Sequence, residues 1–275
     1  MTRLRDWMAM ATIGCLDAAC ASSPAPGVAP FAVRADLVAS RSTRPYGMAR
    51  ATEDAQEGAF EGDNVDLRND LDARGSFGYG CVLDVSLAAD RELRSTYRLV
   101  DGFEGDHVLA RARRFDGETF GPDERVAAEV EWERIALSYA QRLLAVRGHH
   151  FPDTDVLARL GVERSKFDMS LAGTVTPNEA RQVLITAPFA GIEGRIAVLP
   201  SLLLWASADA GGWSNDGVHF LLADLAAGVR VDVSGPLQAI LGYDLALRDG
   251  QIRDEEISAV RLLTHTVSLG VGVRF

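Results

Sequence analysis

The sharpest chemical pattern in the sequence is a row of alternating glutamates, Glu129, Glu131 and Glu133. Alternate residues of an extended chain share a face, so these carboxylates would lie side by side and repel one another unless cations lie close. Candidate cations stand on the neighbouring predicted strands: Arg111, Arg113, Arg159 and Arg164. The hypothesis is an inward ion-pair network that blocks the lumen of a barrel. A cation-selective constriction and a solvated outer wall are the alternatives.

The histidines offer weaker chemistry. The adjacent pair His149-His150 lacks a third ligand nearby in the sequence, so we expect no metal there. His219 and His265 fall near the outer ends of predicted strands, where a Ser–His pair would suit a lipid-modifying enzyme. Ser207 and Ser258 are available, but no spacing ties either of them to a histidine. We therefore expect no catalytic residue, no cofactor and no metal.

Composition narrows the class of protein. The chain has 275 residues and no uninterrupted apolar run of the ~18 residues that a membrane-spanning helix needs. A transmembrane strand needs only ~9–11 residues with alternate apolar positions. The net charge of −11 excludes a nucleic-acid partner, because that function requires a basic surface. Cys81 stands alone in the body of the chain, so no disulfide framework is expected there.

The N-terminal segment has the layout of an export signal. Residues 1–21 combine early arginines with a short apolar stretch and end in small residues, which predicts a signal peptide. Lipidation on Cys15 and a misassigned start are the alternatives. Residues 22–31 are rich in Pro and Ala and are predicted to be a linker. The remaining range, 32–275, is predicted to be one β-barrel domain.

The clearest strand is the last one, Thr264 to Phe275. Its apolar side chains alternate with small or polar ones, and it ends on an aromatic residue on the apolar face. The same alternation, bounded by turn residues, predicts ten strands in all, with eight as the alternative. They are Ala32–Met48, Gly75–Leu87, Leu93–Leu99, Ala128–Leu144, Val156–Leu171, Ala190–Val198, Leu202–Ala210, Leu221–Val233, Leu237–Leu247 and Thr264–Phe275.

Two of these strands change the parity of their apolar residues halfway. In Ala128–Leu144 the apolar positions pass from Val130 and Trp132 to Ile135 and Leu137, and Val156–Leu171 behaves similarly. A β-bulge, which adds one residue to a strand, produces such a change. We therefore expect a bulge in each of the two strands.

The connections alternate in length. Those after the second, fourth, sixth and eighth strands are short, and the others are mostly longer and more polar. Outer-membrane barrels have short periplasmic turns and long outer loops, so both termini are predicted to lie in the periplasm. In such a barrel Leu241, Tyr243 and Leu245 point outward, and Gln238 and Asp244 point inward. A soluble ligand-binding barrel in the periplasm would reverse these faces.

A resemblance supports the membrane alternative. The stretch Asn64 to Leu71, the Phe120-Gly121-Pro122 turn, the strand Ala128–Leu144 and the closing strand to Phe275 together resemble small bacterial outer-membrane β-barrel proteins of the OmpA-like transmembrane-domain type. The resemblance implies an all-β, closed, antiparallel, up-and-down transmembrane barrel with a structural or narrow-passage, porin-like role. It implies two partners, outer-membrane lipid and the barrel-assembly machinery, the latter through the strand ending at Phe275. It implies no enzyme activity, and it identifies neither a ligand nor an oligomeric state.

Overall fold

The computed structural model describes residues 32–43, 45–52, 65–115, 118–147, 152–215, 217–253 and 257–275. The predicted signal peptide, the linker, the pair His149-His150 and one predicted turn residue pair, Asp116-Gly117, lie outside this part. The described chain is built from strands, and it contains no helix long and apolar enough to cross a membrane. The strands are β1 (Val33–Ser42), β2 (Tyr46–Thr52), β3 (Val65–Asp66), β4 (Phe77–Ala88), β5 (Arg91–Val108), β6 (Arg113–Phe115), β7 (Glu118–Phe120), β8 (Arg125–Val146), β9 (Asp153–Gly173), β10 (Glu179–Leu199), β11 (Leu202–Asn215), β12 (Val218–Ser234), β13 (Leu237–Arg253) and β14 (Ile257–Arg274).

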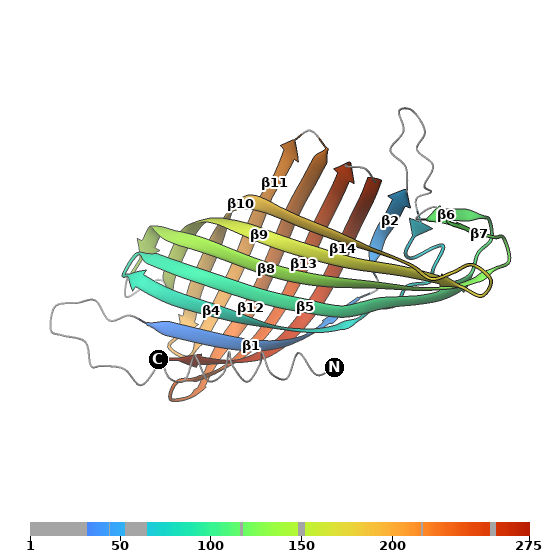
Figure 1. The fold of residues 1–275 in the computed structure, drawn as a ribbon. Coiled ribbons are helices and arrows are strands. Elements are labelled where there is room, and N and C mark those ends of the chain that lie inside the picture. The colour runs from blue at the N-terminus through green and yellow to red at the C-terminus, as the bar shows by residue number, and fades with distance from the viewer. Residues whose placement is uncertain are drawn as a thin grey trace.

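Ten of these strands close into a barrel (Figure 1). Their order around the sheet is β1, β4, β5, β8, β9, β10, β11, β12, β13 and β14, and β14 pairs with β1 to complete the ring. Every neighbouring pair is antiparallel, so the predicted up-and-down barrel of ten strands is confirmed. Closure pairs both edges of every strand through the middle of the ring, although β10 extends beyond its ladder with β11 at one end.

The first barrel strand is made of two pieces. Both β1 and β2 pair with β14, through Ser42 opposite Thr266 and Tyr46 opposite Leu263. Pro45 lies between the two pieces and has no N–H to donate to a ladder, which accounts for the break. β3 then pairs with β2.

The barrel has two different ends. At the termini end the first residue of β1, Val33, exchanges hydrogen bonds with Phe275, and the connections of β4 to β5, β10 to β11 and β12 to β13 are tight turns. At the opposite end, the loop end, β5, β8, β9 and β10 extend further (Figure 1). The strands there are longer than the sequence predicted. Residues 179–186 and 211–215 were expected in loops, but they belong to β10 and β11.

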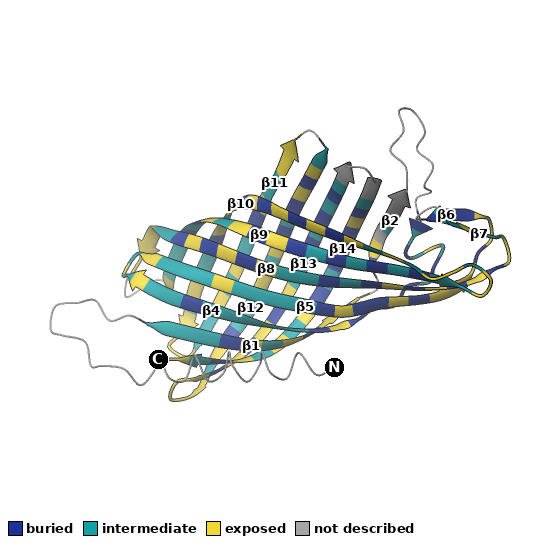
Figure 2. Ribbon diagram, in the orientation of Figure 1, coloured by how far each residue is buried: buried dark blue, intermediate teal, exposed yellow. Residues whose placement is uncertain are grey.

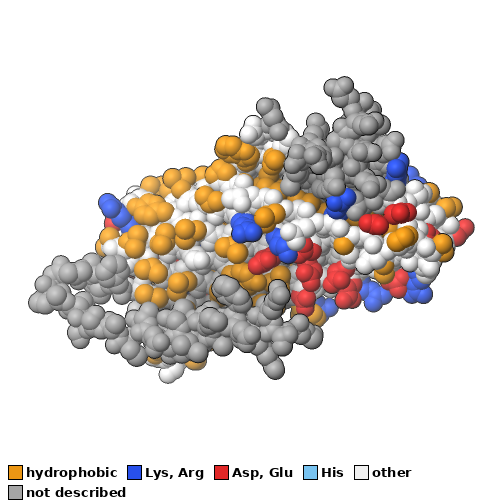
Figure 3. Space-filling model, in the orientation of Figure 1, with side chains coloured by type: hydrophobic (Ala, Val, Ile, Leu, Met, Phe, Trp, Pro, Cys, Tyr) orange, Lys and Arg blue, Asp and Glu red, His pale blue; other side chains and the backbone are white. Residues whose placement is uncertain are grey.

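In the termini half, the outer surface is apolar and the lumen is polar. Leu241 is 50% exposed and Tyr243 is also exposed, whereas Gln238 on the opposite face is only 6% exposed. This confirms the predicted facing of β13. Part of an apolar belt is visible as orange side chains over the left half of Figure 3. Its exposed members around the barrel include Leu37, Leu137, Leu160, Val162, Ile192, Leu204, Leu225, Leu241 and Leu269.

In the loop half, β8 and β9 exchange the chemistry of their two faces. The even residues of β8 from Val126 to Ala140 all face inward and are buried or nearly so. They include large apolar side chains as far as Trp132, and beyond it they are the ion-paired Arg134 and the small residues Ala136, Ser138 and Ala140. The predicted bulges at the parity changes are wrong, because the β8–β9 ladder is continuous from Val126 to Arg142. The sequence pattern instead marks the level at which the outer surface stops being apolar. Ile135 pairs with Arg164 at this level, and Glu133 pairs with Lys166 just beyond it.

The interior of the loop half is a buried apolar core. The ring of Trp132 stacks on Phe167 with centroids 6.0 Å apart, and both side chains are almost fully buried. Further members of this core come from both sides of the barrel: Val130, Met169, Val183, Ile185, Phe220, Leu222 and Leu262. Dark blue bands in Figure 2 mark buried residues on strands of both sides. The turn after β3, with Leu67 and Leu71, and the hairpin β6–β7, with Phe115 and Phe120, contribute to the same core.

A buried carboxylate ties two loops together at this end. Glu124 accepts hydrogen bonds from the backbone N–H groups of Thr176 (2.8 Å), Gly121 (2.8 Å) and Val175 (3.1 Å). These bonds favour the charged form and lower the pKa of Glu124 to about 2. Its carboxylate therefore joins the β7–β8 turn to the connection between β9 and β10.

Acid should loosen this junction. Because the pKa of Glu124 is depressed in the folded state, its stabilisation is fully present above the ordinary value of 4.5 and is lost as the pH falls through about 2. We expect the protection of the Val175 and Thr176 amides, measured as their exchange rate relative to that of an unstructured peptide at the same pH, to fall over that interval. Glu124→Gln should make their exchange fast at neutral pH and remove the acid dependence. Residue-resolved hydrogen exchange measures both, and slow exchange in the variant would contradict the assignment.

Candidate functional site: the ion-paired lumen and the outer acidic groove

The lumen of the termini half is crossed by a chain of ion pairs. Arg94 of β5 contacts Asp84 of β4 and Glu193 of β10, both at 2.6 Å. Asp84 also contacts Arg34 of β1. Asp36, two residues further along β1, contacts Arg34 at 3.3 Å and Arg230 of β12 at 2.8 Å. The chain therefore runs from one wall of the barrel to the other.

Two further arginines extend this layer. Arg195 contacts Glu193 of its own strand at 2.6 Å and Glu92 of β5 at 2.6 Å. Arg159 of β9 donates to Asp209 of β11 at 2.9 Å. The packing is tight: a Cβ on Gly191 would lie 1.9 Å from an oxygen of Asp209. Glycine at that position leaves the room that the charged side chains need.

A second layer of ion pairs lies nearer the loop end. Arg248 of β13 is completely buried and binds two carboxylates, Glu163 of β9 at 2.7 Å and Asp224 of β12 at 2.7 Å. Arg134 of β8 contacts the same two carboxylates, at 2.6 and 2.7 Å. The guanidinium of Arg248 also lies over the ring of Trp132, 5.3 Å from its centroid. Trp132 thus joins the second layer to the apolar core on its loop-end side.

Charge is balanced across the two layers. With the pair Arg98–Asp244 at 2.8 Å, the network contains eight arginines and eight carboxylates. The arginines are Arg34, Arg94, Arg98, Arg134, Arg159, Arg195, Arg230 and Arg248, and the carboxylates are Asp36, Asp84, Glu92, Glu163, Glu193, Asp209, Asp224 and Asp244. Desolvated charges are tolerated only when they are paired, so this arrangement allows the lumen to be packed with side chains.

The predicted lumen cluster is not brought together. Glu129, Glu131 and Glu133 are the odd residues of β8 and lie on its outer face, opposite the buried even residues. Arg113 pairs with Asp70 at 2.6 Å in the loop end, and Arg111 is exposed. The expectation of an inward cluster was wrong, because it assumed that the apolar face of every strand points outward along its whole length. Beyond the belt the polar face of β8 points outward and its apolar face lines the core.

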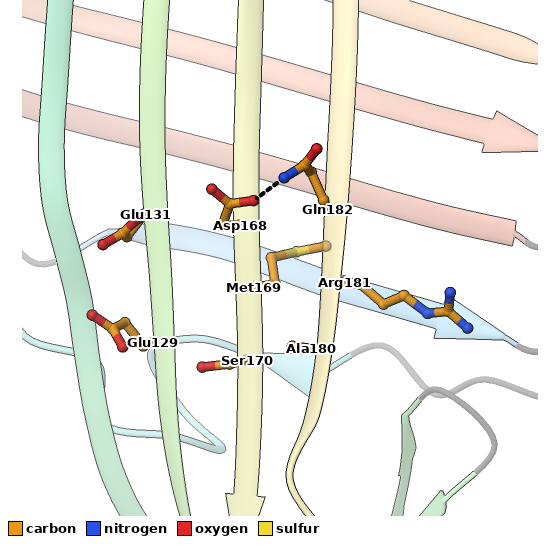
Figure 4. Close-up of a pocket in the computed structure, with 8 residues that line it drawn as sticks. All are labelled: Glu129, Glu131, Asp168, Met169, Ser170, Ala180, Arg181 and Gln182. Carbon is orange, nitrogen blue, oxygen red and sulfur yellow. Dashed lines mark hydrogen bonds between the residues drawn. The ribbon is translucent and has the colours of Figure 1, made fainter. Parts of the chain in front are cut away.

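Two of these glutamates, Glu129 and Glu131, instead border a groove on the outer surface (Figure 4). It crosses β8, β9 and β10, and it is lined by Glu129, Glu131, Asp168, Met169, Ser170, Ala180, Arg181 and Gln182. Asp168 accepts hydrogen bonds from Gln182 at 2.7 Å and from Lys166 at 2.5 Å. No described residue gives Glu129 or Glu131 a hydrogen bond or an ion pair. The groove is therefore acidic and only partly compensated.

The histidine hypotheses find no support in the geometry. His265 faces outward, where its Nδ1 lies 2.6 Å from the hydroxyl of Tyr243, and His219 is also on the outer surface. Ser207 belongs to the inward parity of β11, with Asp209, so neither histidine can reach it. The side chain of Ser258 lies outside the described set. Within that set, no group of histidine, cysteine and carboxylate side chains is arranged to hold a metal ion.

The sequence did not predict the lumen network. The residues of the network nevertheless lie on strand faces that the sequence pattern identified as polar. Arg94 pairs with Glu193 and Arg230 with Asp36 over very large sequence separations. Those pairings depend on how far each strand is shifted against the next around a closed barrel, which no local spacing encodes. The signal that was available is compositional: arginines and carboxylates alternate with apolar residues on several predicted strands.

Comparisons with known proteins agree with the architecture. No family model matches the chain, and no curated protein matches its sequence. Among solved structures, the outer membrane protease OmpT from Escherichia coli superposes with a TM-score of 0.54 at 10% identity, covering 91% of this chain and 100% of that one. The translocator domain of the autotransporter NalP from Neisseria meningitidis covers 100% of this chain at 12% identity, with a TM-score of 0.46. The chain thus has the fold of bacterial outer-membrane β-barrel proteins, as its sequence resemblance predicted.

Proposed function

We propose that this protein is a barrel of the bacterial outer membrane whose lumen is closed, and that its role is structural. It would anchor the extended sheet of β5, β8, β9 and β10 outside the cell, with both termini in the periplasm. The observation that carries the proposal is the combination of an apolar belt outside with a charge-balanced, ion-paired filling inside.

The belt supports the membrane location. In hydrocarbon every backbone N–H and C=O must be paired, and a closed barrel achieves this. Leucines and valines that are half exposed around the whole termini half would be costly in water and favourable in lipid. The level at which the outer face of β8 and β9 turns polar is then the outer boundary of the hydrocarbon.

The filling supports a structural role over passage. A solute moving along the lumen has to displace two layers of ion pairs and then the apolar core around Trp132 and Phe167. Breaking a buried pair leaves an uncompensated charge at a cost of ~3–5 kcal/mol. Barrels of ~8 strands are filled in this way, whereas open channels appear nearer 16 strands.

Conductance in planar bilayers tests the closed lumen. We expect no stable open-channel conductance from the purified protein. We expect the same from Arg94→Ser, because the layer around Arg248 and the apolar core still close the lumen above that position. Long-lived, voltage-independent conductance steps from the unaltered protein would overturn the structural role in favour of passage.

Location and orientation are tested separately. In a background without native cysteines, Asp90→Cys places a thiol in the β4–β5 turn at the termini end, and Ser214→Cys places one at the opposite end. A membrane-impermeant maleimide added to intact cells should label only the second variant. Labelling of the first alone reverses the orientation, and recovery of the protein in the soluble periplasmic fraction refutes the membrane location.

A further inference from the structure

The ladder between β10 and β11 stops before β10 does. β10 pairs with β9 from Glu179 to Ala197, but with β11 only from Phe189 onward. Among the described strands, residues 179–188 therefore have a neighbour on one side only. The two strands separate at the loop end in Figure 1, where β10 and β11 point in different directions.

Pro188 explains where the ladder ends. Its carbonyl oxygen points toward β11, because a Cβ on Gly211 would lie only 2.2 Å from it. The ring nitrogen of Pro188 faces the same side and has no hydrogen to donate, so the next backbone bond to β11 cannot form. In an antiparallel strand, alternate residues direct both of their backbone groups to the same neighbour. The N–H and C=O groups of Ala180, Gln182, Leu184 and Thr186 therefore point to the unpaired side.

The middle of this free edge lacks the usual protection against strand pairing. Proteins commonly guard exposed edges with charged side chains or proline, and here Glu179 and Arg181 stand at one end and Pro188 at the other. From Gln182 to Ala190 the sequence QVLITAPFA contains no charged residue and is rich in β-formers. An edge with unpaired donors and acceptors at regular spacing is complementary to the backbone of another extended chain.

The groove beside the edge indicates what charge such a chain would carry. Ala180 and Gln182 belong both to the free edge and to the lining of the acidic groove, and Glu129 and Glu131 stand unpaired in that groove. In Figure 4 Arg181 extends away from these carboxylates. A strand added to β10 would lie about 10 Å from β9, since neighbouring strands are ~4.8 Å apart. A long basic side chain on its outward face would therefore lie over the groove.

We propose that the free edge of β10 binds an extended, basic segment of another polypeptide by strand addition. The partner's backbone pairs with residues 180–186, and its arginine or lysine side chains face the carboxylates of Glu129, Glu131 and Asp168. Main-chain hydrogen bonds supply the affinity, and the groove supplies the preference for positive charge. This proposal does not depend on the closed lumen, and its test works in detergent micelles.

Residue-resolved amide exchange tests the edge. The probe is a synthetic, end-capped peptide of alternating Val and Arg. In the free protein we expect the amides of Gln182, Leu184 and Thr186 to exchange much faster than those of Val183 and Ile185, which face β9. The probe should slow the first three by about tenfold or more. If the amides of Gln182, Leu184 and Thr186 exchange slowly without the probe, the edge is already covered by the chain itself. If the probe leaves their exchange unchanged, the edge binds no added strand. Either result overturns the proposal.

Two matched pairs separate backbone from charge. Leu184→Pro removes a free-edge N–H without touching the β9 ladder and should abolish protection by the probe, whereas Leu184→Ala keeps the N–H and should retain it. The double variant Glu129→Gln with Glu131→Gln should bind the Arg peptide more weakly than the unaltered protein does. A matched peptide with Glu in place of each Arg should not bind the double variant. If both peptides bind the unaltered protein equally well, the partner is not basic and the proposal fails. If Leu184→Pro does not fold, the exchange measurement on the unaltered protein still decides.

Discussion

Replacing Arg248 by alanine should destabilise the barrel more than any other single charge removal in the lumen. The side chain is 0% exposed and is held by Glu163 and Asp224 together. Its removal leaves Arg134 as the remaining partner of both carboxylates. We expect the free energy of unfolding to fall by about 3–5 kcal/mol, the cost of breaking a buried pair.

Urea unfolding in lipid vesicles measures this loss. Arg125→Ala is the matched control, because Arg125 also pairs with a carboxylate, Asp106 at 2.6 Å, but both side chains are largely exposed. An exposed pair is worth only about 0–1 kcal/mol, so the control should change little. Equal losses in the two variants would mean that the lumen is hydrated and that Arg248 is not desolvated.

A double-mutant cycle shows whether the network acts as a unit. Glu163→Gln and Arg248→Met each break the same contact, so their combined loss should be smaller than the sum of the single losses. Additive losses would contradict the direct contact seen between the two side chains.

The sequence predicted the barrel well, because each barrel strand repeats one simple pattern. Along β14, apolar residues from Val267 to Phe275 alternate with small or polar ones, and this period fixes the faces without knowledge of any neighbour. Turn chemistry was equally local. An Asp-Gly pair flanked by β-formers, such as Asp116-Gly117, is a hairpin signal that requires no knowledge of distant residues, and the flanking Phe115 and Glu118 are paired.

The candidate site was predicted poorly, because it depends on the environment of each face. The glutamates of β8 were expected in the lumen, since one environment was assumed along the whole strand. The parity changes of β8 and β9 carried the missing information. Ile135 and Arg164, where the two changes occur, are direct partners across the ladder. Two adjacent strands that change at the same level indicate a boundary in the surroundings, whereas a bulge would affect one strand alone.

That boundary leads to the second large effect, on β9. Leu160 is 64% exposed on the outer face, within the belt and well below Arg164. Ser170 lies on the same face of the same strand, but beyond the boundary and opposite Glu129. If hydrocarbon surrounds the belt, Leu160→Lys should lower the free energy of unfolding of the vesicle-inserted protein by about 2–4 kcal/mol, the penalty of a lysine near the membrane midplane.

Ser170→Lys should cost nothing measurable or should stabilise slightly, because the new ammonium group faces water and the unpaired carboxylate of Glu129. Both substitutions add the same charged side chain to the same strand, so the change in total charge is the same in the two variants. Urea titration of vesicle-inserted protein gives both free energies. A penalty at position 170 as large as that at position 160 would place the hydrocarbon boundary beyond the glutamates. The polar outer face of the loop half would then lie within the membrane, and the inversion of the two faces along the barrel would need another cause.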